Sequence, residues 1–270
     1  MNSTVQNVGE LLRTWRQHRR LSQLHLAAEA EVSQRHLSFL ESGRSTPSRE
    51  MLLRLAEHLA IPLRERNSLL VAAGLAPVYG ERDLHDPEFA AARRVIELIL
   101  RGHEPHPALA IDRHWQLLLA NQSVYRLLTG VEPALLQAPV NVLRLSLHPG
   151  GLAPRVANFR QWRAHLLARL AQQIDACADP VLMALAEELA AYPVPVGARA
   201  YRATGQGEFA GIAVPLELAT TDGTLSFLST TTVFGTPVDI SLSELAIESL
   251  FPADQATAVA MQRLTDGGAA

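Results

Sequence analysis

The sequence predicts two folded parts: an all-α bundle of five short helices, followed by an α+β domain with an antiparallel sheet and flanking helices. Through about residue 75, apolar residues recur at helical spacing, and Ser or Pro stands before most of the expected helices. A stretch rich in Gly, Pro and charge follows at 74–88, which is typical of a linker. Beyond it, strand and hairpin patterns lie among helical ones.

Length and composition suit two soluble domains. The chain has 270 residues, of which 48% are apolar, so each part can bury a core. No apolar run approaches the roughly 20 residues that span a bilayer, and the N-terminus lacks the pattern of a signal peptide. We therefore expect a cytoplasmic protein that does not associate with membranes. Cys177 is the only cysteine, and its apolar helical surroundings predict a buried structural side chain.

The charge is distributed unevenly along a chain that contains no lysine. Residues 1–80 carry 10 Arg and 7 Glu, a net charge of +3, whereas residues 81–270 carry 14 Arg and 20 acidic residues, a net charge of −6. A mildly basic head on an acidic body is compatible with nucleic-acid binding at one end, although +3 alone is weak evidence.

Residues 21–48 predict two short helices joined by a sharp turn. Ser22 and Ser33 are suitable N-cap residues, and Leu37 and Leu40 lie three apart on one face of the second helix. Side chains that can reach base edges or phosphates remain on its outer side: Gln34, Arg35, His36, Ser38 and Phe39. Gly43 would end this helix, and Arg44, Ser45 and Thr46 behind it could hydrogen-bond phosphate.

The whole pattern resembles the helix-turn-helix of the XRE/Cro repressor family, a lambda-repressor-like fold. The matching positions are Leu21-Ser22-Gln23, Leu26-Ala27, Val32-Ser33, Leu37-Ser38, Glu41, Gly43-Arg44 and Pro47-Ser48. The resemblance implies binding of double-stranded operator DNA as a homodimer, with the second helix in the major groove. It implies that Gln23 and Ser33 lie at the heads of the two helices near phosphate, that the outer residues face bases, and that Arg44 and Ser45 face the backbone. Gln34 would pair with adenine, Arg35 with guanine, and Phe39 would pack on a thymine methyl.

Glu31 is the one departure in the turn, where the family usually has Gly. If Glu31 adopts a left-handed conformation, its Cβ costs about 1 kcal/mol. The alternative for this region is a helical bundle that binds protein instead of DNA.

The second part opens with a predicted helix over 87–102. A loop with two prolines follows, and it contains His103, Glu104 and His106. Without a third ligand at helical spacing, these residues do not predict a metal site. Residues 108–112 and 115–119 predict a hairpin, and Asn121 is placed to cap the next helix. This order of elements resembles the start of a PAS-type sensor domain.

A long helix is predicted over 155–176, and another over 180–192. The apolar stripe of the first predicts core packing, with a pocket wall or protein interface as alternatives; it comprises Val156, Phe159, Trp162, Leu166, Leu170 and Ile174. Arg155 is unusual because a cation in the first turn opposes the helix dipole. It therefore either pairs with an acid or helps hold an anion.

The strongest hairpin signal is Asp222-Gly223, between two strand-like runs. With these two as the central turn residues, Phe227 would face Leu218 and Ser229 would face Leu216. Thr231 would face Val214, and Val233 would face Ile212. Hydroxyls of Ser229 and Thr231 would then lie on an apolar face, bonded either to nearby backbone or within a ligand pocket. The tail predicts two helices separated by Pro252, the first with a capping-box spacing of Ser241 and Glu244.

From about residue 82 to 264, the order of segments resembles the MmyB-like ligand-binding domain. The matching stretches are IDRHW with Asn121, PVNVLRLSLHPGGLAPR, FRQWRAHLLARL, LSFLSTTTVFGTPVDI and ELAIESLFPAD. The resemblance implies a PAS-like sheet, flanking helices and a cavity for a small apolar ligand, such as a fatty acid. We expect Arg155 to bind its carboxylate and Trp162, Phe227, Ser229 and Thr231 to line the pocket. The predicted domains are 1–75 for DNA binding, 76–86 as linker, 87–264 for the ligand and 265–270 as a disordered tail.

These observations predict a ligand-responsive DNA-binding transcription regulator without catalytic residues, metal or cofactor. One alternative is a DNA-binding antitoxin-like protein or adaptor whose second domain binds a protein partner. Another is an enzyme tethered to DNA, which the sequence does not favour because it has no phosphate loop, GxSxG or HExxH motif.

Overall fold

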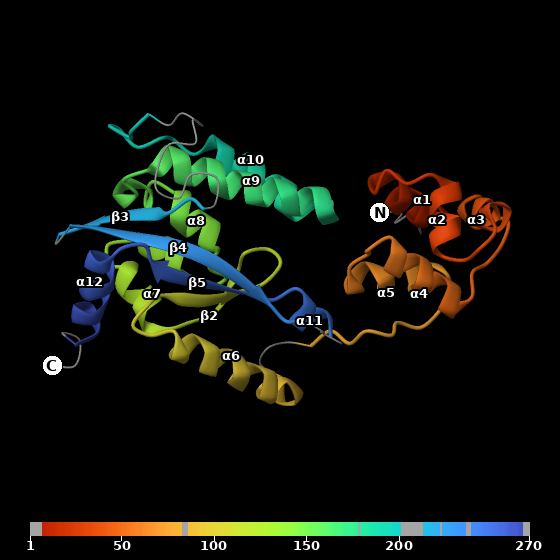
Figure 1. Ribbon diagram of the computed structural model, residues 1–270, viewed down its shortest axis with the longest axis horizontal. Coiled ribbons are helices and arrows are strands. Elements are labelled where there is room, and N and C mark those ends of the chain that lie inside the picture. The colour runs from red at the N-terminus through yellow and green to blue at the C-terminus, as the bar shows by residue number, and fades with distance from the viewer. Residues whose placement is uncertain are drawn as a thin grey trace. The chain divides into compact units, whose positions relative to one another are not determined.

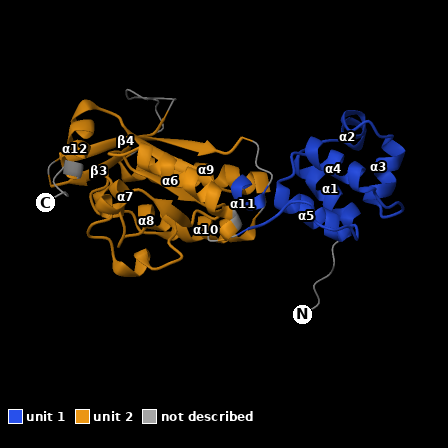
Figure 2. Ribbon diagram, turned by 90° about the horizontal axis from the view of Figure 1, so that it is seen from below, with its two compact units in different colours: residues 1–82, 236–243 blue, residues 83–235, 244–270 orange. Residues whose placement is uncertain are grey.

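The computed structural model describes residues 7–82, 86–177, 179–200, 213–221, 223–235 and 239–266. These residues form two compact units, coloured separately in Figure 2. The first consists of residues 7–82 together with 239–243, and the second contains the other described residues. The first unit therefore includes a short segment from late in the chain.

Five helices form the N-terminal part of the first unit, as the sequence predicted (Figure 1). They are α1 (Val8–His18), α2 (Gln23–Glu29), α3 (Gln34–Glu41), α4 (Arg49–His58) and α5 (Leu63–Ala72). Side chains at the start of α1 to α4 accept a backbone hydrogen bond, namely those of Asn7, Ser22, Ser33 and Ser48. The core between the helices is mostly leucine, which suits the helical spacing of the apolar positions. The late segment adds α11 (Ile240–Ser243) to this unit.

The second unit is an α+β domain built on a five-stranded antiparallel sheet. Its strands are β1 (Ala108–Ile111), β2 (Leu117–Ala120), β3 (Leu216–Thr220), β4 (Gly223–Val233) and β5 (Ala246–Pro252), in the spatial order β2-β1-β5-β4-β3. Its helices are α6 (Ala90–Gly102), α7 (Gln122–Leu127), α8 (Val142–Leu147), α9 (Phe159–Cys177), α10 (Pro180–Ala191) and α12 (Gln255–Asp266). Short 3₁₀ turns cover Pro87–Phe89, Pro133–Leu136 and Ala153–Arg155. The predicted fold class is confirmed for both parts of the chain.

Helices cover both faces of the sheet. Ile96 and Leu100 of α6 pack with Ala108 and Ala110 of β1 on one face. On the other face, the apolar side of α9 packs against β3 and β4, with α8 and α10 beside it (Figure 1). Strand alternation directs every second residue to each layer.

The register of the β3–β4 hairpin differs from the prediction by two residues. Phe227 pairs with Leu216, where we expected Leu218, and Thr220 pairs with Gly223. Gly223, with φ of 129°, therefore belongs to the last pair of the ladder instead of the turn. Asp222, the other expected turn residue, lies outside the described residues. Of the expected partners, Ile212 lies outside the described residues. A shift of two keeps the same residues on each face, so the predicted apolar face is preserved.

The first of the two helices predicted in the tail is wrong. Its expected cap, Ser241, lies inside the four-residue helix α11, and Ala246–Pro252 forms the strand β5. β5 pairs with β1 on one side and β4 on the other, so every residue of it joins a ladder. A short apolar run fits helical and strand spacing alike, and here the pairing with two neighbours decides the outcome.

Candidate functional site

The second helix of the paired motif, α3, presents a polar surface. Ser33 caps it by accepting a hydrogen bond from the His36 amide at 3.1 Å. Leu37 and Leu40 are buried, whereas Gln34 and Arg35 are exposed. His36, Ser38 and Phe39 are half-buried beside them. The two most exposed of the predicted outward residues, Gln34 and Arg35, therefore lie at the N-terminal end of the helix.

Phe39 organises two cations on this surface. The guanidinium carbon of Arg35 lies 5.4 Å from the Phe39 ring centroid, and that of Arg44 lies 5.9 Å from it. Each such contact at an exposed site is worth about 0.5–1 kcal/mol. The ring thus orients a cation on the helix and a cation in the following loop toward the same region. The amides of Arg44 and Ser45 both donate to the Phe39 carbonyl, which fixes the loop behind α3.

Two predicted contact residues have partners within the unit. His36 Nε2 lies 3.2 Å from Met51 Sδ, so the ring leans toward α4. Gln23 Nε2 donates to Glu41 Oε2 at 2.8 Å, which ties the head of α2 to the end of α3. The Gln23 carbonyl oxygen retains its acceptor capacity, but the amide donor serves the bundle.

A buried ion pair links α1 to the C-terminal end of α3. Arg16 Nε donates to Glu41 Oε1 at 2.6 Å and Arg16 Nη2 donates to Glu41 Oε2 at 2.9 Å. The side chains are only 11% and 3% exposed, and the hydrogen bond with Glu41 raises the pKa of Arg16 above its ordinary value. This pair joins α1 to α3, and sequence reasoning missed it because the partners are 25 residues apart.

Glu31 adopts the left-handed conformation that the turn requires, with φ of 53°. Val32 donates from its amide to the Ala27 carbonyl at 2.9 Å, which closes the end of α2. The condition of the prediction about Glu31 is therefore met, since a residue with a Cβ occupies a position that favours glycine, and the cost of that Cβ stays a prediction.

We expect Glu31→Gly to stabilise the first unit by about 1 kcal/mol, because it removes the steric cost of a left-handed Cβ. Glu31→Ala is the matched control: it removes the same carboxylate but keeps the Cβ, so it should change stability little. Denaturant unfolding of both variants checks this. A glycine variant no more stable than the alanine variant would contradict the strain.

The second unit encloses an apolar cavity of about 130 Å³ between the sheet and helices α7, α8 and α9. The sheet contributes residues of β1, β3, β4 and β5, including Leu109, Leu216 and Leu250. Trp162 of α9 lines it and donates from Nε1 to Ser146 Oγ at 2.8 Å. The chemical character is that of a small-molecule pocket: apolar walls with few polar groups.

Arg169 and Glu248 form a charged pair in the cavity wall. The Arg169 guanidinium donates to both carboxylate oxygens of Glu248, at 2.7 and 3.3 Å, and to Thr231 Oγ1 at 2.9 Å. It also lies 4.9 Å from the Trp115 ring centroid. These bonds use three of the five N–H donors of an arginine, so capacity remains for an acceptor on a bound molecule. Burial lowers the pKa of the nearby His165 below its ordinary value, and the charge of Arg169 lowers it further.

Of the five predicted pocket residues, two are in the lining of the cavity, whereas Phe227, Thr231 and Arg155 are not. Trp162 and Ser229 line the cavity, and Phe227 is fully buried in the same core. Thr231 bonds the Arg169–Glu248 pair. Trp162 is only 5% exposed, so its stripe is core, as predicted, and does not form a protein-binding surface.

Arg155 lies elsewhere. Its Nη1 donates to the carbonyls of Leu127 and Thr129 at 2.9 and 3.0 Å, and its Nε donates to that of Ala219. It borders a separate hollow beside α12 and is absent from the lining of the apolar cavity. Neither an acid nor an anion explains its position, since backbone carbonyls take its donors.

Sequence reasoning missed Arg169 and Glu248, the charged pair of the cavity. Arg169 follows Trp162 by seven residues and Leu166 by three, so helical spacing alone places it on the inner face. Glu248 could not be recognised while its segment was interpreted as a helix. As a strand residue it shares a face with Ala246 and Leu250.

Two family models match the chain, one in its N-terminal part and one in the remainder. The model described as helix-turn-helix matches residues 12–66. The model described as the MmyB-like transcription regulator ligand binding domain matches residues 92–264, well over half of the chain. No curated protein matches the chain. Within the described residues, none of the helices is both long and apolar enough to cross a membrane.

Proposed function

The chain belongs to the MmyB-like transcription regulators, with an XRE-type helix-turn-helix and a ligand-binding domain, and from this premise we propose how it reads DNA and what it senses. It is a DNA-binding regulator, not an enzyme. We propose that a homodimer binds an inverted-repeat operator through α3, in the cytoplasm. A small apolar ligand with a polar head, such as a fatty acid, occupies the cavity and alters operator affinity.

The observation that most strongly supports DNA reading is the set of polar side chains on α3. Gln34 and Arg35 project from its N-terminal end, which is the part of such a helix that meets base edges. Arginine recognises guanine through two parallel hydrogen bonds, and glutamine recognises adenine in the same manner. Phe39 supports Arg35 from behind, while Ser38 and His36 flank it. Arg44 and Ser45, just beyond the helix, and the capping residue Ser33 are our candidates for phosphate contacts.

Arg35→Ala should relax specificity at one or two operator positions by about 1–3 kcal/mol, because one bidentate base contact is lost. Arg44→Ala is the matched control, since loss of a phosphate contact weakens binding to all sequences alike and lowers the salt dependence. Binding selections from random duplexes, repeated with each variant, measure both effects. An unchanged base preference in the Arg35 variant would remove that residue from base readout.

Support for the ligand class comes from the cavity wall. Leucine and tryptophan side chains provide an apolar surface for an alkyl chain, and Arg169 provides donors for an oxygen-bearing head group. Among ligand classes, a fatty acid combines these two requirements in one molecule. Arg169 is therefore our candidate for the head group, in place of Arg155.

Support for the homodimer comes from the general geometry of helix-turn-helix proteins. Two copies of α3 reach successive major grooves when the half-sites lie about 34–36 Å apart, one turn of B-DNA. Native mass spectrometry of the purified protein, with organic extraction, reports its stoichiometry and any bound small molecule together. A monomer both alone and on selected DNA would rule out the dimer.

A further inference from the structure

The connection between β4 and β5 folds with the DNA-binding unit, although the strands that it joins belong to the sheet. β4 ends at Val233 and β5 begins at Ala246, whereas residues 239–243 between them cluster with the N-terminal helices. α11, the helix in this connection, packs against α5, and Figure 2 gives both the same colour. The chain therefore joins the DNA-binding unit to the sheet through β4 and β5, as well as through the segment after Arg82.

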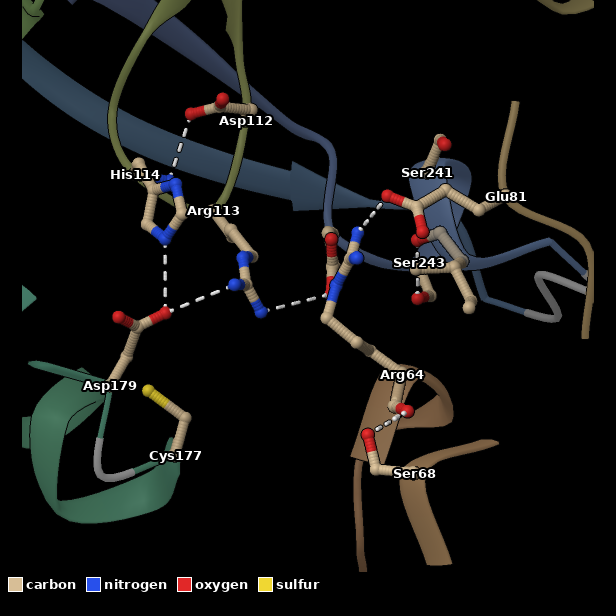
Figure 3. Close-up of polar contacts among 12 residues, drawn as sticks. Arg64, Ser68, Glu81, Asp112, Arg113, His114, Cys177, Asp179, Ser241 and Ser243 are labelled. Carbon is tan, nitrogen blue, oxygen red and sulfur yellow. Dashed lines mark hydrogen bonds and ion pairs between the residues drawn. The ribbon is translucent and has the colours of Figure 1, made fainter. Parts of the chain in front are cut away.

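Residues 78–82 form the platform for this connection. Asn67 Nδ2 on α5 donates to the Tyr79 carbonyl at 2.8 Å, and its Oδ1 accepts from the Tyr79 amide at 3.2 Å. Arg64 Nη2, one turn earlier on α5, lies 2.6 Å from Glu81 Oε1 (Figure 3). The segment after α5 is thereby held along that helix.

α11 is attached to this platform by backbone and side-chain bonds. The Ile240 amide donates to the Gly80 carbonyl at 2.8 Å. Ser241 Oγ donates to the Arg82 carbonyl at 2.5 Å and accepts from the Arg82 amide at 3.2 Å. The Ile240 side chain is only 2% exposed, although its helix has four residues. It lines a hollow with Leu11, Asn67, Ser68, Val71 and Ala72.

The surface that receives Ile240 belongs to the helices that hold α3. Leu11 is on α1, and Gly9 of the same helix packs against the end of α3. A Cβ on Gly9 would lie 2.3 Å from the Leu40 carbonyl oxygen, so the two backbones are in direct contact. A displacement of α1 consequently displaces α3, because closely packed elements move together.

The other end of the connection leads to the ligand cavity. Glu248 of β5 bonds Arg169 in the cavity wall, and four residues earlier Glu244 lies 3.5 Å from Arg113 Nη1. Arg113 also pairs with Asp179, which His114 contacts at 2.9 Å (Figure 3). Burial opposes ionisation of Asp179, but the bonds from His114 and a backbone amide and the charge of Arg113 hold its pKa below the ordinary value. Residues 244–252 thus make one ion pair at the cavity, through Glu248, and another directly after α11, through Glu244.

We propose that the docking of α11 on α1 and α5 transmits the state of the cavity to the DNA-binding helices. The path runs from Glu248 along β5 to Glu244, and from there into Ile240. Docked and undocked arrangements of α11 then differ in DNA affinity, and a ligand that disturbs the Arg169–Glu248 pair shifts the balance between them. This inference rests on the proposed ligand sensing, whose cavity it uses as the input.

A ligand-free double-mutant cycle in the full chain tests the coupling. Glu248→Gln perturbs the cavity end, Ile240→Ala weakens the docking, and hydrogen exchange of the α1 and α5 amides is the readout. We expect Glu248→Gln to change exchange in α1 and α5 about fivefold or more in the otherwise natural chain. The same substitution should have no effect on these amides in the Ile240→Ala background. Val233→Ala, at an exposed site at the end of β4, is the matched control for Ile240→Ala. In the Val233→Ala background, Glu248→Gln should still change exchange in α1 and α5.

If Glu248→Gln or Ile240→Ala unfolds the unit in which it lies, two less disruptive substitutions take their place. Thr231→Val removes one hydrogen bond to Glu248, and Ser241→Ala removes the bonds to Arg82. The proposal would be overturned if the cavity substitution left exchange in α1 and α5 unchanged. It would also be overturned if that substitution changed exchange equally with and without the substitution in α11. Because no ligand enters this cycle, its result is independent of whether the cavity binds a fatty acid, so the two proposals can fail separately.

Discussion

Arg16→Met is expected to destabilise the DNA-binding unit by about 3–5 kcal/mol, because it leaves the Glu41 carboxylate buried without its partner. The Glu41 side chain is 3% exposed, and among the described residues Gln23 alone would remain to bond it. Methionine preserves most of the length of the aliphatic side chain, so loss of packing contributes little. Native-state hydrogen exchange of amides in α1 and α3 measures the free energy of opening of this unit within the full chain.

The double variant Arg16→Met/Glu41→Leu is the matched control. It removes both charges and leaves an apolar contact, so most of the lost stability should return. A double variant as unstable as the single one would show that shape, and not the unpaired charge, sets the penalty. Since the pair joins α1 to α3, we also expect the single variant to lose DNA binding as α3 loses its fixed position.

Arg169→Met is expected to weaken binding of dodecanoate by about 2–5 kcal/mol, or about 30-fold to several thousand-fold, because a buried charged contact is lost. Glu248→Gln should act in the opposite direction: it removes a negative charge next to the carboxylate and leaves the Arg169 donors in place. Trp115 lies against Arg169, and Trp162 lines the cavity. Their fluorescence reports occupancy in a titration.

Dodecanol separates the head group from the tail. It has the same alkyl chain without the carboxylate, so both variants should bind it with nearly the affinity of the unchanged protein. An Arg169 variant that binds dodecanoate as tightly as the unchanged protein would exclude this arginine as the head-group partner. Equal losses for acid and alcohol would point to a collapsed cavity instead.

The helical bundle was predicted well because the residues that determine each helix lie close together in the sequence. Caps at Ser22, Ser33 and Ser48 and the spacing of buried leucines determine where α2, α3 and α4 begin and which face they bury. The sheet was harder to predict. β5 is the central strand, and its identity depends on pairing with β1, which lies more than a hundred residues earlier. No window of sequence contains that pairing.

The candidate sites show the same division. The outward residues of α3 were predicted from one helix and its period, and the structure leaves Gln34 and Arg35 exposed at its N-terminal end. The ligand cavity draws on four strands and three helices, and its charged pair, Arg169 and Glu248, joins two of them. Trp162 was identified because it lies in a stripe on one helix. Arg155 was assigned by its helix position alone, and only the three-dimensional contacts show that backbone carbonyls take its donors.

The most direct test of ligand-controlled DNA binding compares the protein as purified with the same protein after its small molecules are removed by a hydrophobic resin. Operator affinity is measured for both by fluorescence anisotropy at one fixed salt concentration, on a duplex selected with the purified protein. We expect the affinities to differ about fivefold or more and the difference to reverse when the extracted molecule or dodecanoate is added back. Equal affinities in all three states would contradict control of DNA binding by the cavity.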